Sequence, residues 1–460
     1  MTLETMKVSI IGTGYVGLVS GACLAEVGHD VTCVDIDAGK VERINRGEAP
    51  IHERGLAELL GRHIGNGLRA TTALDDAVRA TDITLIAVGT PFDGERIDLR
   101  FIREAATAIG RAIATKPGYH VVAIKSTVVP GTTEDVVAPL LEVASGKQAG
   151  RDFGLGMNPE FLREGEAVRD FLEPDRIVLG GIDQRSLDTL AGLYRPFTGV
   201  DVMRVSPRTA ETIKYAANSL LATMISFSNE IGNLCAALDN VDVVEVMRGV
   251  HLDKRLTPLL EDGSRIKPGF TSYLEAGCGF GGSCFPKDVK ALVAHGASVG
   301  APMRILEQVL AVNASQPLCM IGILRKHFAE LSGLRVAVLG LAFKPGTDDL
   351  RESPALRVVE ELLREGAAIT AYDPVAGPAA AAMMAGAGDM VIADRIQEAV
   401  EGAAAVLLLT RWPEFSELPQ LLAALPDPPL LVDGRRMIPH HLVPRYEGIG
   451  FGSNRQSSPT

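Results

Sequence analysis

The stretch KVSIIGTGYVG, residues 7–17, decides the fold of the first part of the chain. It opens with a mainly apolar run typical of a buried parallel strand, and the glycines that follow have the spacing GxGxxG. Glycines in this pattern allow a tight turn and let a pyrophosphate approach the amino end of the next helix. The stretch therefore predicts a strand, a turn and a helix that bind a dinucleotide.

The residues that follow complete a strand-turn-helix-strand unit. Apolar residues at 16–27 predict a helix that ends at Gly28, and VTCVD at 31–35 predicts a second strand. Asp35 closes this strand, where an acid accepts hydrogen bonds from the adenosine ribose. Asp37 follows where an arginine would be needed to hold a 2'-phosphate, so we expect NAD rather than NADP. The cofactor-binding residues predicted here are Gly12, Gly14, Tyr15, Val16, Gly17 and Asp35.

Strands and helices alternate in two separate parts of the chain. In the first part we expect strands at 83–88, 120–124 and 153–157 and a helix at 99–114, and in the second part strands at 335–340, 368–372, 405–409 and 429–432. Alternation of this kind predicts parallel sheets with helices on both faces. The expected fold class is therefore α/β, with two Rossmann-like doubly wound parallel-sheet domains, although the second part lacks GxGxxG.

One long helix is expected to join these parts. Residues 209–238 are largely apolar on several faces, and about thirty helical residues would span roughly 45 Å. Lys214 and Asn218 lie four residues apart on one face of this helix. They are either a solvent-facing pair without a role or part of a substrate site. The expected boundaries are 1–205, 206–328 and 329–450, followed by a disordered tail at 451–460.

The stretch GFGGSCFPKD, residues 279–288, is the main candidate for chemistry. Its glycines let the backbone approach a ligand, Cys284 is a candidate nucleophile, and Lys287 and Asp288 add a cation and a carboxylate. A thiol can capture an aldehyde as a thiohemiacetal and, after a hydride leaves, hold the acid as a thioester. The alternative is a glycine-rich turn with a buried, inert cysteine.

Composition excludes several classes of function. The 460 residues carry a formal net charge of -12, which argues against a nucleic-acid or anionic-membrane surface. No apolar run is long enough to span a bilayer, and we expect no signal peptide. The six cysteines show neither CxxC nor zinc-ligand spacing, so neither a disulfide framework nor a metal site is predicted. These features favour a cytoplasmic location.

Taken together, the motifs make the chain resemble the nucleotide-sugar dehydrogenase family over residues 6–445. The motifs that carry the resemblance are IGTGYVGL at 11–18, Thr90 with Pro91, KSTVVPGTT at 125–133, NPEFLREG at 158–165, KYAANS at 214–219, GFGGSCFPKD at 279–288 and FKPGTDDLRESP at 343–354. Ser283 and Lys287 are similar to the glucose and mannose branches of this family, and Phe285 is more similar to the glucose branch.

The resemblance implies a four-electron oxidation of a sugar C6 alcohol to a carboxylate by two NAD molecules in turn. Cys284 would hold the aldehyde and then the thioester. Lys214, Asn218 and Asp288 would handle the hydroxyl proton and the oxyanion, and Asp288 would also help to activate water. Glu160, with Thr127, would assist thioester hydrolysis. A carboxylate and an ammonium near one oxygen can do this work without a metal.

The family's ligand contacts also correspond to residues of this chain. For NAD they add Lys40, Thr90, Thr127, Glu164, Lys287 and Arg351 to the fingerprint residues. For the substrate they are Glu160, Phe161, Leu162, Arg163, Glu164, Lys214, Asn218, Arg265, Tyr273, Leu274, Glu275, Ala276, Gly277, Gly281 and Lys344. The resemblance further implies an NAD domain, a central helix that makes a homodimer, and a C-terminal nucleotide-sugar domain, with the site in a cleft between domains.

Two questions stay open in the sequence. One is the class of protein, because a two-electron NAD-dependent hydroxyacid dehydrogenase or a protein that binds NAD without turnover would share the first domain. The other is the substrate, because Arg265 precedes Tyr273 by a longer stretch than the family pattern has. This insertion either changes the wall around the nucleotide or is a neutral loop extension. We expect UDP-glucose, with dTDP-glucose and GDP-mannose as alternatives.

Overall fold

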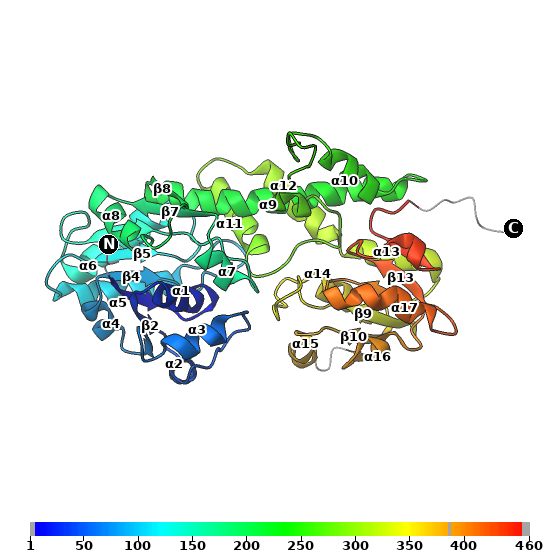
Figure 1. Ribbon diagram of the computed structural model, residues 1–460, viewed down its shortest axis with the longest axis horizontal. Helices are drawn as coiled ribbons and strands as arrows, with labels where there is room; N and C mark the ends of the chain where they lie inside the picture. Colours follow the sequence, from blue (N-terminus) through cyan, green and yellow to red (C-terminus); the bar gives the residue numbers. More distant parts are fainter. Residues whose placement is uncertain (1–4, 385–387, 453–460) are drawn as a thin grey trace. The chain divides into compact units, whose positions relative to one another are not determined.

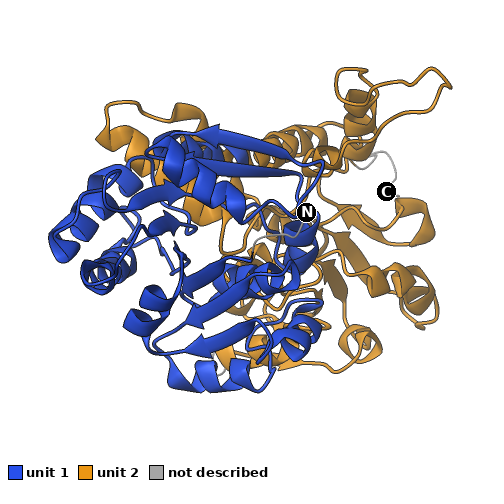
Figure 2. Cartoon of the chain, turned by 60° about the vertical axis from the view of Figure 1, so that its left-hand side comes forward, with its two compact units in different colours: residues 1–217 blue, residues 218–460 orange. Residues whose placement is uncertain are grey.

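The computed structural model describes residues 5–384 and 388–452, and it divides the chain into two compact units, residues 1–217 and 218–460 (Figure 2). Each unit contains one open sheet with helices packed on it (Figure 1). Most of the tail that was expected to be disordered, from residue 453 on, lies outside the described residues. Just before it, Phe451 forms a β-bridge with Asp242.

Unit 1 is built on an eight-stranded sheet in the order β3-β2-β1-β4-β5-β6-β7-β8. The strands are β1 (Lys7–Ile11), β2 (Asp30–Val34), β3 (Leu68–Thr71), β4 (Ile83–Ile86), β5 (Val121–Ile124), β6 (Gly154–Met157), β7 (Arg176–Gly181) and β8 (Asp201–Val205). Strands β1 to β6 are parallel, as the alternation of strands and helices predicts. The order in which strands are added to the sheet reverses between β1 and β4, and doubly wound sheets bind ligands at this point.

Helices cover both faces of this sheet. They are α1 (Tyr15–Glu26), α2 (Ala38–Asn45), α3 (Leu56–His63), α4 (Leu74–Ala80), α5 (Arg100–Ala114), the π-helix η1 (Thr132–Val137), α6 (Ala138–Ser145), α7 (Ala167–Leu172) and α8 (Gln184–Gly192). One apolar core lies between the sheet and α1, α3, α7 and α8, and a second lies between the sheet and α4, α5 and α6. The sheet is therefore buried on both sides, which explains its continuous apolar runs.

The far edge of the sheet differs from the sequence-based expectation. Strand β7 pairs antiparallel with β6, Gly156 lying opposite Gly181, while β8 is parallel to β7. The sequence analysis predicted none of β3, β7 and β8. Strand β8 forms the edge and is largely exposed, and in β3 (LRAT) the exposed Arg69 stands between buried residues, so neither has the apolar run by which a buried strand is recognised.

Unit 2 contains a six-stranded, wholly parallel sheet in the order β11-β10-β9-β12-β13-β14. Its strands are β9 (Arg335–Leu339), β10 (Ala368–Tyr372), β11 (Met390–Ile392), β12 (Ala405–Leu408), β13 (Leu430–Asp433) and β14 (Tyr446–Gly448). Helices α14 (Pro354–Arg364), α15 (Gly377–Met383), α16 (Ile396–Val400) and α17 (Leu418–Ala423) and the 3-10 turns η3 (Pro413–Glu417) and η4 (His440–Leu442) accompany them.

A long helix, α9 (Pro207–Ala237), begins in unit 1 and ends in unit 2, close to the expected 209–238 (Figure 1). The other helices of this region are α10 (Val243–His251), the 3-10 turn η2 (Gly269–Tyr273), α11 (Phe285–Ser298), α12 (Arg304–Ser315) and α13 (Leu318–His327). Within the described residues, none of the helices combines the length and the apolar character needed to cross a membrane.

The glycine fingerprint shows why two of its glycines are required by the fold. Gly12 has φ +100°, and a Cβ built there would lie 2.7 Å from the carbonyl oxygen of Ala87. A Cβ at Gly17 would lie 1.9 Å from the carbonyl oxygen of Gly12, so α1 can start close to β1 only without a side chain. Gly14 differs, because a Cβ there meets no atom within 4 Å.

We therefore predict opposite outcomes for two alanine variants of this loop. Gly17→Ala forces backbone apart and should destabilise unit 1 by about 1–3 kcal/mol, since overpacking a tight contact costs that much. Gly14→Ala should leave the thermal midpoint of the free protein unchanged. Differential scanning calorimetry of both variants checks this, and equal midpoints for Gly17→Ala and wild type would contradict it.

Candidate active site

The predicted ribose acid, Asp35, is held against the glycine fingerprint. Its Oδ2 accepts hydrogen bonds from the Thr13 backbone N–H at 2.9 Å and from the Thr13 hydroxyl at 2.5 Å. Lys40 Nζ lies 3.4 Å from the same oxygen. Burial alone would raise the pKa of the Asp35 carboxyl, but these hydrogen bonds and Lys40 bring it below its ordinary value. The carboxylate is therefore ionised at the place where an adenosine ribose needs an acceptor.

The same loop fits the pyrophosphate of a dinucleotide. Helix α1 begins directly after Gly14, so its first backbone N–H groups have no partner within the helix and favour an anion. The open space around Gly14 leaves room for phosphate oxygens to approach the backbone. NAD would accept a hydride when bound here, and Asp35 with Lys40 would hold its ribose.

A residue that the sequence analysis missed ties this fingerprint to the loop at 158–166. Glu53 is buried and accepts hydrogen bonds from the backbone N–H groups of Gly165 at 2.7 Å and Ala167 at 2.9 Å, and from the Tyr15 hydroxyl. Burial and the Glu53 carboxylate both raise the pKa of Tyr15, so its hydroxyl stays protonated and donates. Glu53 lies between His52 and Arg54 in a connecting loop, so nothing in the local sequence distinguished it from a solvent-exposed acid.

A hydrogen bond between two of the predicted cofactor residues joins the loops that follow the carboxyl ends of β4 and β5. The Thr90 hydroxyl donates to the Thr127 backbone carbonyl at 2.8 Å. Farther along this loop, Glu211 of α9 accepts from the backbone N–H groups of Gly131 at 2.6 Å and Thr133 at 2.8 Å. Burial raises the pKa of Glu211 to about 7 despite these bonds. Glu211, which the sequence analysis did not single out, therefore fixes the loop that carries Thr127.

Glu160 and Lys214 form a buried ion pair, with Glu160 Oε1 3.0 Å from Lys214 Nζ. Their side chains expose only 6% and 4% of their surface, so the solvent-facing alternative for Lys214 is wrong. Burial opposes the charge on Glu160, but Lys214 and the Leu162 backbone N–H lower the pKa of its carboxyl below the ordinary value. The structure thus brings an ionised carboxylate and a lysine side chain together in a buried position.

A second buried lysine, Lys125, lies at the end of β5 and was not predicted. Its ammonium donates to Asn158 Oδ1 at 2.9 Å and lies 3.4 Å from the Tyr194 hydroxyl. Burial lowers the pKa of Lys125 to about 8, while the Glu160 carboxylate opposes this shift. The sequence shows only a lysine directly after the apolar run VVAI at 121–124, and its contacts with Asn158 and Tyr194 leave no local pattern.

In unit 2, Cys284 is the residue that precedes α11, so its side chain lies at the amino end of that helix. It is partly exposed, whereas Cys278, in the same stretch, is fully buried. The thiolate and the oxyanion that forms on its adducts are negatively charged, and a helix amino end stabilises negative charge. The alternative of a buried, inert cysteine therefore describes Cys278 rather than Cys284.

Asp288 lies one helical turn after Cys284 and is held at both carboxylate oxygens. Asn218 Nδ2 donates to Oδ2 at 2.7 Å, and Lys287 Nζ donates to Oδ1 at 2.6 Å. Asp288 exposes 1% of its surface and Asn218 7%, so Asn218 is not solvent-facing either. Unit 2 therefore brings together four of the residues singled out in the sequence.

Other predicted ligand residues have partners within the free chain. Arg163 makes a paired contact with Asp170, at 2.6 Å and 3.0 Å, and Arg351 is paired in the same way with Asp349. Glu275 forms an ion pair with Arg411. A ligand that uses these side chains has to replace the partners or share them.

The predicted substrate loop holds aromatic and cationic side chains. The Tyr273 ring lies 6.2 Å from that of Phe285, which follows Cys284. Arg265 donates to the backbone carbonyls of Leu252 and Thr257, both at 3.0 Å, within its own loop. The remaining predicted positions differ in burial: Leu274, Ala276, Gly277 and Gly281 are buried, and Phe161, Leu162 and Lys344 are half-buried.

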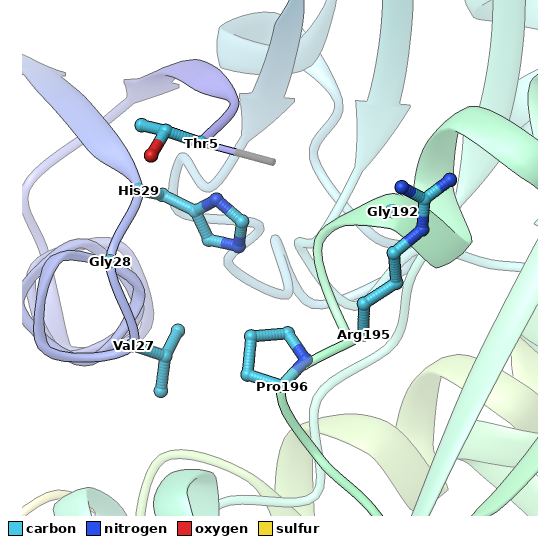
Figure 3. Close-up of a pocket in the computed structure, with 7 residues that line it drawn as sticks. All are labelled: Thr5, Val27, Gly28, His29, Gly192, Arg195 and Pro196. Carbon is cyan, nitrogen blue, oxygen red and sulfur yellow. The ribbon is translucent and has the colours of Figure 1, made fainter. Parts of the chain in front are cut away.

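A cavity of about 170 Å³ in unit 1 lies apart from these groups (Figure 3). It is lined by residues that precede β1 and β2, namely Thr5, Val27, Gly28 and His29, by Gly192 at the end of α8, and by Arg195 and Pro196 after it. The amino ends of the strands are opposite to the ends where the fingerprint lies. His29 uses both ring nitrogens, with Met6 N and Leu193 O, so it is not a free catalytic base.

Comparisons with known proteins identify a family whose three domains match successive parts of the chain. The UDP-glucose/GDP-mannose dehydrogenase family is matched by its NAD binding domain over residues 6–198, its central domain over 208–315 and its UDP binding domain over 337–440.

Individual proteins extend this similarity over nearly the whole chain. A UDP-glucose 6-dehydrogenase of Haloferax volcanii is 45% identical over 97% of this chain and all of its own length. A GDP-mannose 6-dehydrogenase of Pseudomonas putida is 41% identical over 80% of this chain and 81% of its own. The solved UDP-glucose dehydrogenase of Pyrobaculum islandicum superposes with a TM-score of 0.88 at 39% identity, covering 98% of this chain and 99% of its own. The resemblance stated from the motifs is confirmed.

The buried Lys125 ammonium predicts a measurable pH dependence. Between about pH 8 and the ordinary lysine value of 10.5, the unfolded amine keeps a proton that the folded amine has released. The stability of the wild type relative to Lys125→Met should therefore rise with pH in this window, by up to about 1.4 kcal/mol per pH unit. Urea unfolding of both proteins across the window measures it. A stability difference that does not change with pH would show that Lys125 titrates normally.

Proposed function

The chain belongs to the UDP-glucose/GDP-mannose dehydrogenase family, and we propose that it oxidises UDP-glucose to UDP-glucuronate. It is an NAD-dependent enzyme whose first domain is the NAD-binding domain of that family. The observation that carries the proposal is the arrangement around Cys284. A partly exposed thiol at a helix amino end stands one turn before a buried carboxylate that Asn218 and Lys287 hold in place.

The reaction needs two oxidations and one hydrolysis. In the first, the C6 alcohol loses a proton and a hydride to become an aldehyde. Cys284 then adds through sulfur to the aldehyde carbon, and the thiohemiacetal loses a second hydride and a proton to become a thioester. Water cleaves the carbon–sulfur bond and releases the carboxylate and the thiol. The balance is one alcohol, two NAD and one water giving one carboxylate, two NADH and three protons.

The chain's own residues supply the charges that these steps require. We assign Lys214, Asn218 and Asp288 to the C6 oxygen, because an ammonium, an amide and a carboxylate can take its proton and stabilise the oxyanion. We assign Glu160, with Thr127, to thioester hydrolysis. The lowered pKa of Glu160 supports a carboxylate that is ready to accept a proton from water. Asp288 helps to activate the same water.

The C-terminal sheet and the relatives support UDP-glucose as the substrate. The UDP binding domain of the family covers residues 337–440, and relatives named UDP-glucose 6-dehydrogenase match nearly the full chain. The GDP-mannose 6-dehydrogenases match about four-fifths of it. We place Tyr273 to Gly277, Gly281 and Lys344 at the sugar and phosphate groups, and keep dTDP-glucose and GDP-mannose as alternatives.

We further propose a cytoplasmic homodimer formed through α9. Leu220, Phe227 and Leu234 follow one another at intervals of seven residues, so they lie on one helix face, and they expose 61%, 49% and 56% of their surface. A stripe of large apolar side chains on a helix favours a protein partner. A second copy supplies an identical stripe, as a twofold interface requires. All six cysteines are free thiols, which favours a reducing compartment.

Cys284→Ser tests the covalent step. A serine ester hydrolyses far more slowly than a thioester, so steady-state formation of the acid should fall at least about 10³-fold. Mass spectrometry of the variant after incubation with UDP-glucose and NAD should show at most a trapped adduct on residue 284. Cys235→Ser, which changes a thiol on α9, is the matched control and should keep normal turnover. Normal turnover by Cys284→Ser would rule out the covalent mechanism.

Substrate choice is tested by comparing three nucleotide sugars. We expect kcat/KM at saturating NAD to be highest for UDP-glucose, followed by dTDP-glucose and GDP-mannose, because specificity is a difference in transition-state binding. A higher value for GDP-mannose would contradict the assignment to the glucose branch. A higher value for dTDP-glucose would leave the reaction intact and change only the base.

A further inference from the structure

Three amide side chains hold the backbone of the loop that leads to Cys284. They are Asn229 of α9, Asn313 of α12 and Gln316, the residue that follows α12. We call these residues the amide clamp. They all bind backbone groups between Gly277 and Phe280, four to seven residues before the nucleophile. The sequence analysis did not single out any of them.

Asn313 pairs with both backbone groups of Phe280. Its Oδ1 accepts from Phe280 N at 2.8 Å, and its Nδ2 donates to Phe280 O at 3.0 Å. One donor and one acceptor of the side chain face one acceptor and one donor of the backbone, so this contact sets both the position and the direction of the loop.

The other two amides hold Gly277. Asn229 Oδ1 accepts from Gly277 N at 2.8 Å, and Gln316 Nε2 donates to Gly277 O at 2.9 Å. Asn233 Nδ2 donates to Gln316 Oε1 at 3.1 Å and so fixes the orientation of that amide. Asn229 and Gln316 have no exposed surface, so water does not compete for these bonds.

The glycines of this loop explain why an external clamp is needed. Gly279 has φ +105° and Gly282 has φ +86°, conformations that L side chains rarely adopt. A chain with glycines at these positions has few side chains to fix it. A Cβ at Gly279 would lie 2.8 Å from Asn313 Oδ1. The loop can therefore pass this close to Asn313 only because residue 279 has no side chain.

We propose that the amide clamp positions Cys284 for attack on the aldehyde. The inference rests on the proposed function, in which Cys284 is the nucleophile. The three amides touch neither the thiol nor the reacting atoms, so they are positioning residues rather than catalytic ones. Misplacing a reacting atom by about 1 Å can cost on the order of 100-fold in rate. Loss of the clamp should therefore lower kcat much more than it changes substrate affinity.

The test compares two variants, each of which removes a side-chain hydrogen bond that involves α12. Asn313→Ala removes the contact with Phe280. Ser226→Ala is the matched control, because the Ser226 hydroxyl donates to Val309 O at 3.0 Å and links α9 to α12 without touching the loop. Hydrogen exchange of the amides at residues 277–284, kcat and KM for UDP-glucose are measured for both. If the alanine variant does not fold, Asn313→Asp, which keeps the acceptor facing Phe280 N, replaces it.

We expect exchange at residues 277–284 to rise at least about tenfold in Asn313→Ala, because the loop opens more often. The same variant should lose roughly 10- to 100-fold in kcat with KM for UDP-glucose within about threefold of wild type. Ser226→Ala should keep wild-type exchange in this loop and wild-type kcat.

Three results would overturn the clamp. One is a kcat for Asn313→Ala within about threefold of wild type, and another is an equal loss of kcat in Ser226→Ala. Alkylation by iodoacetamide of Cys235, which is buried on α9 outside this loop, in Asn313→Ala would assign the loss to wider unfolding and would also overturn the clamp. A wild-type protein that oxidises no nucleotide sugar would instead refute the proposed function, and exchange at residues 277–284 would still decide whether Asn313 holds the loop.

Discussion

A buried carboxylate needs a partner, and helix α9 supplies one for each of the two carboxylates on which the proposed chemistry depends. Lys214 neutralises Glu160 in unit 1, and Asn218, four residues later, donates to Asp288 in unit 2. Removing one member of a buried ion pair typically costs about 3–5 kcal/mol, because the other charge stays buried without compensation. This constraint fixes which face of α9 is polar in a helix that is otherwise largely apolar. It also keeps water away from groups whose charges act more strongly in a dry environment.

The nucleophile depends on a different kind of support. Cys284 follows a loop whose glycines allow close backbone approach but contribute no side chains of their own, so its position has to be set from outside. Hydrogen bonds between the backbone before it and the side chains of Asn229, Asn313 and Gln316 set this position. Beside it, Gly282 N donates to Arg351 O at 2.9 Å. Helix α11 starts immediately after it and directs its amino end toward the charge that develops. Rigid support around a flexible glycine loop is how a thiol is held for reaction while the backbone stays open to a ligand.

The sequence predicted what leaves a local signal. The fingerprint at 12–17, the acid at Asp35 and the parallel strands were found because they follow fixed spacings or long apolar runs. The edge strand β8 was missed because its side chains are exposed. The antiparallel direction of β7 was missed because the direction of a strand depends on its pairing with a strand distant in the sequence, here β6. Glu53, Lys125 and Asn313 were missed for a related reason. Each acts through a backbone or side-chain contact more than thirty residues away in the sequence, and no local pattern records such a contact.

The central claim is a four-electron oxidation with a covalent intermediate, and the most direct measurement is the number of NADH molecules formed for each sugar consumed. With limiting UDP-glucose and excess NAD, absorbance gives the NADH formed and chromatography gives the sugar lost. The account predicts two NADH for each UDP-glucose, with UDP-glucuronate as the product and no free aldehyde. One NADH for each sugar, with the aldehyde released, would show that Cys284 does not retain the intermediate and would contradict the account.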